Sequence, residues 1–366
     1  MQVRKLSWNT LSIGGALALL LCNFVKYIDP IYFPFSFLAG LVFPFVLILF
    51  SIILLINLLQ KNKIAWWMLI TLLLCYKGVF ATFGTNFSNK KNKEGVKLMS
   101  YNVKNFDLYN WTGNKKTRQQ IFDFIKAENP DIINFQEFYS DENEHNNIQY
   151  IKDSLGYTYY HFQQSHHAID KHLKTKNNLY WGIATFSKFP IKNKVAVPFT
   201  NNSNNTCIYS DIELFDKKVR VYNMHLQSIH LGYEDYNTLE ELAENQTTQW
   251  FRLKNILRKI KKAATLRSSQ AKTVQSSIAQ SPYPVCVSGD FNDVPVSYTY
   301  QKIATGLQDA FRKKGFGFGS TFTNKLSFYR IDHALFSKEF KILSYEKIEN
   351  SLSDHYPILI QFKENN

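Results

Sequence analysis

The sequence predicts an α/β protein in which a helical membrane region precedes a larger domain of alternating strands and helices. Two features of the 366-residue chain support this division. Residues 1–96 contain long stretches without any charged side chain, as membrane-spanning helices do. From residue 97 onward, short apolar segments alternate with amphipathic ones, a pattern typical of a sheet that is covered by helices.

Residues 1–87 are predicted to hold about three membrane-spanning helices. They are "WNTLSIGGALALLLCNFV" (8–25), "IYFPFSFLAGLVFPFVLILFSIILLINLL" (31–59) and "IAWWMLITLLLCYKGVFATFG" (64–84). About 20 apolar residues cross the hydrocarbon core, because a helix satisfies its own backbone polar groups there. The alternative for the first segment is a cleaved signal peptide, since Arg4 and Lys5 precede it. It has no clear small-residue cleavage site and two further spans follow, so we predict a multi-pass protein of the inner or plasma membrane.

Loop charges do not decide the orientation of these helices. With the N-terminus inside, four basic residues would lie inside and five outside, so the positive-inside rule gives no answer. Three spans place the two ends of the chain on opposite sides of the membrane. We expect the domain after residue 96 on the outer side, the periplasmic or extracellular one. The polar segment "SNKKNKEGV" (88–96) lacks periodicity and is the predicted linker.

Charge and cysteine content exclude few classes of function. The formal net charge of +14 divides into +7 for residues 1–96 and +7 for residues 97–366. The second excess is weak support for a polyanionic partner, and a composition rich in lysine and asparagine explains it equally well. The four cysteines show no CxxC spacing, which indicates neither a structural zinc site nor a disulfide framework.

The domain from residue 97 to 366 is predicted to contain strands that mostly alternate with helices. A long charged stretch (238–280) has helical spacing, and we expect a pair of helices packed on the sheet there. A further helix is predicted at 117–130 and another near 297–305. The predicted strands are 96–103, 131–138, 157–162, 180–187, 207–215, 219–226, 284–290, 328–336, 340–347 and 356–362.

Polar side chains recur where these predicted strands end. A single aspartate in a buried strand can be a structural anchor, but six clusters of carboxylate, amide or imidazole groups are harder to explain in that way. Since strand ends of a sandwich converge at one rim, we expect these side chains to share a pocket. They are Asn102 in "SYNV", Glu137 in "NFQE", His225 in "NMHL", Asp290 and Asn292 in "GDFND", Asp354 and His355 in "SDH", and Asp332 inside the apolar "RIDHALF".

These residue types fit metal-assisted hydrolysis of a phosphodiester. A hard ion such as Mg²⁺ takes oxygen ligands and uses only one or two protein carboxylates, which leaves positions for water and phosphate. Glu137 and Asn102 are the candidate ligands for it. Mn²⁺ is the possible alternative ion.

The remaining residues supply the proton transfer and the hydrogen bonds to phosphate that such a reaction requires. Asp290 is the candidate base for the attacking water, and Asn292 and His225 are candidate donors to phosphate. A His355–Asp332 pair would hold an imidazole at the phosphate, because a carboxylate fixes its tautomer and raises its pKa.

The motifs occur in the order that is found in the endonuclease/exonuclease/phosphatase superfamily, which the chain resembles over residues 97–363. They are "SYNV", "NFQE", "GIATFSKFPI", "NMHL", "GDFND", "RIDHALF" and "SDHYPI". The resemblance implies a four-layer α/β/β/α sandwich of two mixed sheets. It also implies that Glu137 is the principal metal ligand with Asn102 beside it, and that Asp354 lies near the metal. Abasic-site endonucleases of this superfamily carry an acid at the position of Lys104, which disfavours a DNA-repair function.

We therefore expect a membrane-anchored, Mg²⁺-dependent phosphoesterase. Nucleic acid is the first candidate substrate, and a phospholipid or sphingolipid headgroup is the second, as in sphingomyelinases; a phosphoinositide phosphatase is a further alternative. The bilayer is the expected partner of the N-terminal helices, and no protein partner is evident. A rival from another class is an inactive interaction domain on a membrane scaffold, but that rival predicts loss of site residues and every expected position is filled.

Overall fold

The structure, a computed structural model, describes residues 2–86, 94–170, 177–199, 205–229, 249–323 and 329–365. The chain forms two compact units. The N-terminal unit comprises Met1–Val79, Gln227–Lys272 and Val296–Lys302, and the sheet unit comprises Phe80–Leu226, Thr273–Pro295 and Ile303–Asn366. Most of the predicted linker and residues 238–248 of the predicted helical pair lie outside the described residues.

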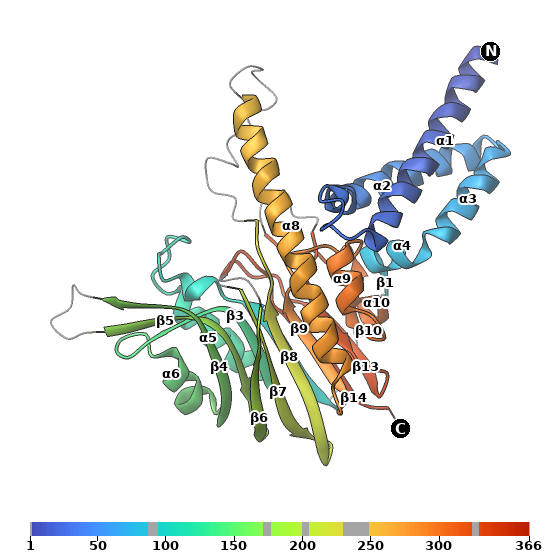
Figure 1. The fold of residues 1–366 in the computed structure, drawn as a ribbon. Helices are drawn as coiled ribbons and strands as arrows, with labels where there is room; N and C mark the ends of the chain where they lie inside the picture. Colours follow the sequence, from blue (N-terminus) through green and yellow to red (C-terminus); the bar gives the residue numbers. More distant parts are fainter. Residues whose placement is uncertain are drawn as a thin grey trace. The chain divides into compact units, whose positions relative to one another are not determined.

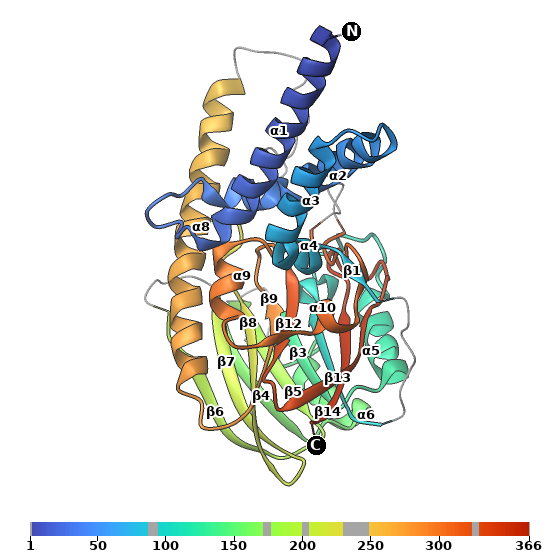
Figure 2. The ribbon, with the colours of Figure 1, turned by 90° about the vertical axis from the view of Figure 1, so that its right-hand side faces the viewer.

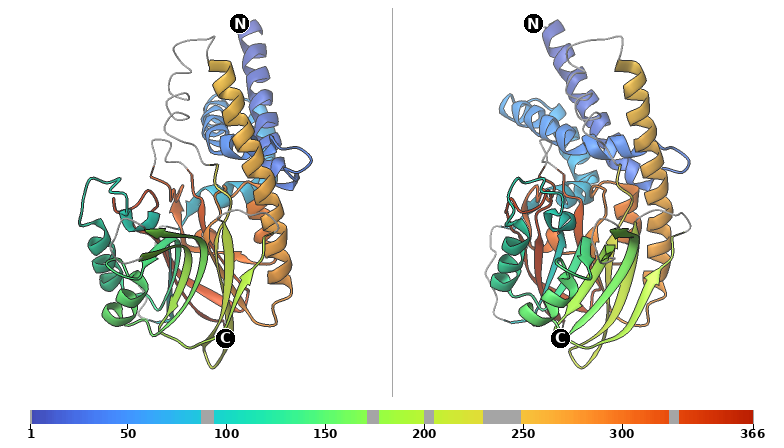
Figure 3. Two further views of the ribbon diagram at one scale, coloured as in Figure 1. Left: turned by 60° about the vertical axis from the view of Figure 1, so that its left-hand side comes forward. Right: turned by 90° about the vertical axis from the view of Figure 1, so that its left-hand side faces the viewer.

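Two six-stranded sheets lie face to face in the described part of the sheet unit (Figures 1 and 3). One has the order β13-β14-β2-β3-β5-β4 and the other the order β10-β12-β9-β8-β7-β6. Strands of the first are β2 (Val96–Asn102), β3 (Ile132–Asp141), β4 (Tyr159–Asp170), β5 (Asn177–Ser187), β13 (Phe340–Lys347) and β14 (Ile358–Glu364). Strands of the second are β6 (Ile191–Val197), β7 (Thr206–Leu214), β8 (Lys217–His225), β9 (Val285–Asp290), β10 (Gln308–Asp309) and β12 (Asp332–Phe336).

Each sheet is mixed, with one parallel pair near its centre. Strands β2 and β3 run parallel in one sheet, and β8 and β9 run parallel in the other, while the remaining neighbours are antiparallel. Parallel strands end at the same edge of a sheet, so β2 ends beside β3, and β8 ends beside β9. This pairing brings residues that are distant in sequence to one rim.

Helices cover the outer faces of the two sheets and complete the sandwich (Figure 2). On one side, α5 (Thr117–Glu128) buries Ile121, Phe122 and Ile125, and α6 (Asn147–Leu155) buries Ile151, in one apolar cluster with Met99 and Phe135 of the sheet. On the other, the last turns of α8 (Gln249–Ala279) contact β8, where the Tyr222 hydroxyl lies 3.0 Å from that of Ser277. Between the sheets, a second apolar cluster includes Leu98, Ile132, Val221, Cys286 and Ile360. The four-layer α/β/β/α architecture predicted from the sequence is confirmed.

Short elements complete the description of the chain. They are η2 (Lys104–Asp107), α9 (Tyr298–Ile303), α10 (Ala310–Lys314) and the two-stranded pair of β1 (Gly84–Thr85) with β11 (Phe316–Gly317). The sequence did not indicate α6 or α10. Helix α8 occupies residues 249–279 of the stretch that was predicted to be helical, and the rest of the predicted helical pair is not tested by the described residues.

The N-terminal unit contains two helices that are long and apolar enough to cross a membrane. Helix α1 (Gln2–Phe24) continues into the 3₁₀ turn η1 (Val25–Tyr27), and α2 (Ser36–Leu59) follows after turns at 31–35. The third predicted span is not one straight helix. It consists of α3 (Ile64–Leu74) and α4 (Tyr76–Thr82), which meet at an angle of 71° because Cys75 leaves the helical region of backbone angles.

Candidate active site

Three predicted site residues lie at strand ends on the same rim. Asn102 is the last residue of β2, His225 of β8 and Asp290 of β9. His225 and Asp290 are direct partners in the parallel register. Asp332, expected inside a strand, is instead the first residue of β12, and it pairs directly with Asp290. The register alone therefore brings three of these residues next to one another.

Glu137 lies at the same rim, although it is inside a strand and not at a strand end. The sequence suggested that its strand ends near residue 138, but β3 continues to Asp141. The pairing of β3 with β5 shifts between Phe135 and Phe138, and Glu137 adopts a left-handed backbone with φ +47°. A bulge of this kind redirects a side chain within a strand, and left-handed backbone at a residue other than glycine is strained. The fold thus holds a strained backbone at the candidate metal ligand.

The side-chain amide of Asn102 joins two carboxylates. Its Nδ2 donates to Glu137 Oε1 at 3.2 Å and to Asp290 Oδ2 at 3.1 Å, and its Oδ1 accepts from the backbone N–H of Lys104 at 3.1 Å. The side chain of Glu137 is 35% exposed, whereas that of Asp290 is 1% exposed. Glu137 is therefore the member of this trio that an incoming ion or substrate can reach.

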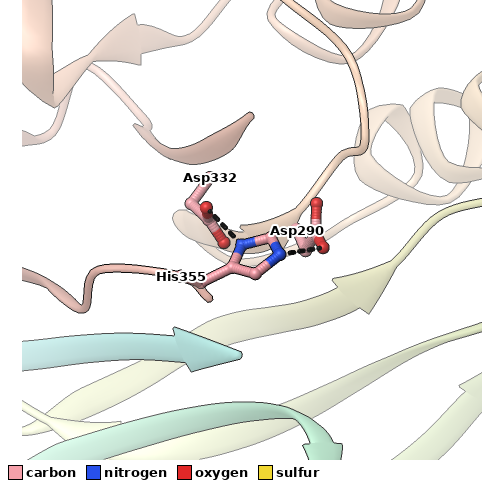
Figure 4. A group of neighbouring side chains, drawn as sticks. All are labelled: Asp290, Asp332 and His355. Atoms are coloured by element: carbon pink, nitrogen blue, oxygen red, sulfur yellow. Dashed lines mark hydrogen bonds and ion pairs between the residues drawn. The ribbon is translucent and has the colours of Figure 1, made fainter. Parts of the chain in front are cut away.

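His355 lies between two buried aspartates (Figure 4). Its Nδ1 is 2.9 Å from Asp332 Oδ2, and its Nε2 is 3.7 Å from Asp290 Oδ2. Burial by itself lowers the pKa of His355, but the carboxylates of Asp332 and Asp290 outweigh it and raise the pKa to about 10. Burial raises the pKa of Asp290 above its ordinary value. The imidazole is thus held in its positively charged, donating form.

His225 lies next to Glu137 and Asp290 without a hydrogen bond to either. Its Nε2 lies 3.8 Å from Glu137 Oε1 and 3.7 Å from Asp290 Oδ2, both beyond hydrogen-bonding distance. This nitrogen is buried and has no hydrogen-bond partner among the described residues. A buried polar atom without a hydrogen-bond partner is uncommon, and a ligand at this rim would supply one.

Asn292 and Gly289 shape the turn after β9. The backbone N–H of Asn292, at φ +52°, donates to Asp290 Oδ1 at 2.8 Å, and its Nδ2 donates to the carbonyl of Leu226 at 2.9 Å. Gly289 has φ +148°, and a Cβ there would lie 2.1 Å from the Met224 carbonyl oxygen. The glycine of "GDFND" is therefore required by the close approach of β8, and Asn292 orients Asp290.

Asp354 lies beside the group and is held by a lysine. Its Oδ2 is 2.8 Å from Lys104 Nζ, which in turn lies 5.0 Å from the centre of the Trp111 ring. The proposed part of Asp354 in metal binding stays a prediction. The sequence had marked Lys104 only as a departure from the abasic-site enzymes, whereas in the structure it binds an acid of the site.

Several oxygen and nitrogen donors could hold a metal ion. Ligand atoms of Asp290, Asp332 and His355 lie within 4.8 Å of one another and are buried. Glu137, which shares the Asn102 amide with Asp290, offers a more exposed carboxylate. The donor set is dominated by carboxylates, which suit a hard divalent cation.

A buried polar layer beneath the site was not predicted. Asn134 Nδ2 donates to Ser288 Oγ at 2.9 Å, and Gln136 Nε2 donates to Asn223 Oδ1 at 2.8 Å, so both bonds connect the two sheets. Thr321 Oγ1 accepts from the backbone N–H of Asp332 at 3.1 Å. Asparagine and glutamine inside the apolar "IINFQE" are the signal that could have revealed this layer.

Comparisons with known proteins agree with this geometry. The profile of the Endonuclease/Exonuclease/phosphatase family matches residues 99–355, and that of a Domain of unknown function (DUF8431) matches residues 4–82. A comparison with curated proteins found no match.

Solved structures of this fold resemble the chain at low sequence identity. An endonuclease/exonuclease/phosphatase from Beutenbergia cavernae has 15% identity and a TM-score of 0.52, with 74% of this chain and 72% of that chain covered. The human Nocturnin catalytic domain with bound sulfate has 17% identity and a TM-score of 0.52, with 77% and 96% covered. A Bacteroides thetaiotaomicron family protein has 16% identity and a TM-score of 0.51, with 75% and 99% covered. These likenesses show the fold.

Proposed function

The chain belongs to the Endonuclease/Exonuclease/phosphatase family, and we propose that it is a membrane-anchored hydrolase that cleaves a phosphodiester with the help of a divalent cation. One observation carries this proposal. His355, Asp290, Asn102 and Glu137 form one continuous polar network across both sheets, with His355 bonded to Asp332 at its buried end and Glu137 at its exposed end. Such a network offers a cation site, a base and a charged donor within reach of one phosphate.

Glu137 is the residue that would hold the cation, with Asn102 and Asp354 as further ligands. Asn102 presents Nδ2 to Glu137, so its amide would have to turn over to act as an oxygen ligand itself. The unpartnered Nε2 of His225 and the strained backbone of Glu137 support a ligand position between them. Mg²⁺ fits this oxygen-rich set, and Mn²⁺ is the alternative. When bound, the cation would polarise the phosphate and offset its negative charge.

The chain's own residues supply the remaining chemistry. Asp290 would accept the proton of the attacking water, and burial raises its pKa, which makes the carboxylate a stronger base. As the water oxygen bonds to phosphorus, the bond to the leaving oxygen breaks. His355, charged and fixed by Asp332, would donate a hydrogen bond to the phosphate as negative charge develops on it. His225 and Asn292 are further candidate donors at the rim.

Two substrate classes remain in the proposal, and each has an observation in its favour. Nucleic acid comes first, on the basic excess of the domain from residue 97. A phospholipid or sphingolipid headgroup comes second, because two N-terminal helices, Trp8–Tyr27 and Ser36–Leu59, are long and apolar enough to cross a bilayer.

Contacts inside the N-terminal unit support three membrane crossings. Asp29 lies between the first two spans, and it accepts from Ser268 Oγ at 2.5 Å and pairs with Lys272 of α8. Helix α8 carries too many charges to cross a bilayer, so the loop at 28–35 and α8 lie on one side. This arrangement requires α2 and the bent α3–α4 pair each to cross once. The N-terminus and the domain after residue 96 would then lie on opposite sides of the membrane, and we place the domain on the outer side.

The test is hydrolysis by the full chain in detergent. Plasmid DNA, sphingomyelin and phosphoinositides are incubated with Mg²⁺ and with EDTA, using wild type, Glu137→Gln and His355→Ala. Glu142→Gln is a matched control, since Glu142 is bound to Asn178 and Tyr180 away from the network. We expect cleavage of one class that EDTA and both site variants abolish and that the control retains. Near wild-type rates in either site variant would refute the assignment.

A further inference from the structure

A cavity of about 510 Å³ opens in the N-terminal unit where two helices are interrupted. Helix α1 gives way to η1 after Phe24, and α3 meets α4 at the 71° bend beside Cys75. Residues from both interruptions line the cavity. Irregular backbone within a membrane region is tolerated where it lines a cavity or packs in protein, so a cavity at these two breaks is structurally consistent.

The wall of this cavity is polar and positively charged on one side. Lys26, Lys77 and Asn23 line it, and none of the described lining residues carries a carboxylate. Lys26 is only 3% exposed, and its Nζ donates to Asn23 Oδ1 at 2.9 Å. A buried ionisable group in or beside a membrane span is costly and commonly marks a functional site.

Gly78 leaves the space that Asn23 occupies in this polar wall. A Cβ at Gly78 would lie 2.4 Å from Asn23 Oδ1 and 3.2 Å from the Phe43 ring. Only a glycine in α4 therefore allows Asn23 of α1 to approach and hold the ammonium group of Lys26. The contact joins the end of the first span to the third.

The other side of the cavity is apolar. Leu21, Phe24 and Leu74 line it and are 68%, 60% and 64% exposed. Apolar side chains of this exposure on membrane helices face lipid. The cavity thus combines two lysines with a surface that suits acyl chains, at the membrane end that adjoins the loop at 28–35.

We propose that this cavity binds the headgroup phosphate of an anionic phospholipid, with Lys26 and Lys77 as its cationic contacts. Basic pockets between transmembrane helices recognise anionic headgroups by charge, while the acyl chains stay against apolar side chains. The inference rests on the proposed membrane anchoring and not on the proposed hydrolysis. The cavity is separate from the residues of the candidate active site.

Native mass spectrometry of the full chain released from detergent micelles tests this site. Dioctanoyl phosphatidylglycerol, dioctanoyl phosphatidylcholine and inorganic phosphate are titrated separately. Lys77→Gln is the main variant because Lys77 is exposed and its change is not expected to disturb folding. Lys26→Gln is the second variant. Lys63→Gln, an exposed lysine between α2 and α3 that does not line the cavity, is the matched control.

We expect the first phosphatidylglycerol to bind at least about ten-fold more tightly than phosphatidylcholine, and inorganic phosphate to bind weakly. Removing a lysine should weaken phosphatidylglycerol binding about five-fold or more in Lys77→Gln and Lys26→Gln, with no change in Lys63→Gln. Equal binding of the two lipids, or equal behaviour of Lys77→Gln and Lys63→Gln, would overturn the site. If inorganic phosphate binds as tightly as phosphatidylglycerol, and this binding depends on Lys77 in the same way, the site recognises free phosphate and the proposal of a lipid ligand is wrong. Hydrolysis of any substrate is not part of this readout.

Discussion

Nδ1 of His355 lies 2.9 Å from Oδ2 of Asp332, and both side chains are buried. The two residues adjoin strands of different sheets. Asp332 opens β12, and His355 lies in the segment just before β14. The bond therefore depends on the whole sandwich and not on local sequence. It holds the proton on Nδ1 and orients the charged ring so that Nε2 points toward Asp290.

Replacement of Asp332 by asparagine should lower the rate of hydrolysis at least about 100-fold, because a neutral amide neither fixes nor stabilises the charged imidazole. Steady-state kinetics on the substrate found for the wild type measure the loss. A thermal melt checks that folding is intact, since the backbone bond from Asp332 to Thr321 does not involve the changed atoms. Retention of full activity would exclude a functional pair.

Glu137→Gln should abolish binding of one divalent ion. The variant keeps the shape of the side chain but removes the charge of the exposed carboxylate at the bulge. Calorimetric titration with Mg²⁺ and Mn²⁺ compares wild type, Glu137→Gln and the control Glu142→Gln. Unchanged ion affinity in Glu137→Gln would place the cation elsewhere.

Because His161 is buried, we expect the folded protein to lose stability in mild acid. It is buried against Ser210, and burial, together with nearby Lys194, lowers its pKa from 6.5 to about 4. Because the folded state favours the neutral ring, the stabilising contribution is complete above pH 6.5 and is lost as the pH falls to about 4. The full effect is about 3 kcal/mol of unfolding free energy.

Chemical denaturation of the wild type and of His161→Gln between pH 7 and pH 4 measures this effect. The variant should lose this part of the pH dependence. His167→Gln is the control, because His167 is exposed and pairs with Asn178 at the surface. A wild-type curve that is no steeper than that of His161→Gln would contradict the assignment.

Membrane topology can be measured with an impermeant maleimide on intact cells. All four native cysteines are buried, so background labelling should be low. We expect Tyr32→Cys and Glu349→Cys to react from one side and Lys63→Cys only after the membrane is opened. Reaction of Tyr32→Cys and Lys63→Cys from the same side would exclude a crossing by α2.

Much of this site could be predicted from the sequence, because strand ends are visible in it. Asn102, His225 and Asp290 each follow an apolar run, and the parallel register then brings them together. To predict that these three residues lie together, only the rule that strand ends meet at one rim was needed, and no other knowledge of long-range packing. The four-layer fold followed from the resemblance.

Other features depend on backbone conformations that composition does not reveal. The left-handed Glu137 lies within a strand, and neither it nor its neighbours Gln136 and Phe138 is a glycine or an asparagine, the residues that usually indicate such a backbone. The bend at Cys75 likewise interrupts a continuous apolar run. The ion pair of Lys104 with Asp354 joins residues 250 positions apart in sequence, so only the folded chain reveals it.

The most direct measurement is the position of Mn²⁺ in crystals of the full chain, located by anomalous scattering. We predict one strong peak within bonding distance of a Glu137 carboxylate oxygen, with Asp290 and His355 facing the same open position. A peak bound only by Asp332 and His355, or none near Glu137, would contradict a shared cation and phosphate site at this rim.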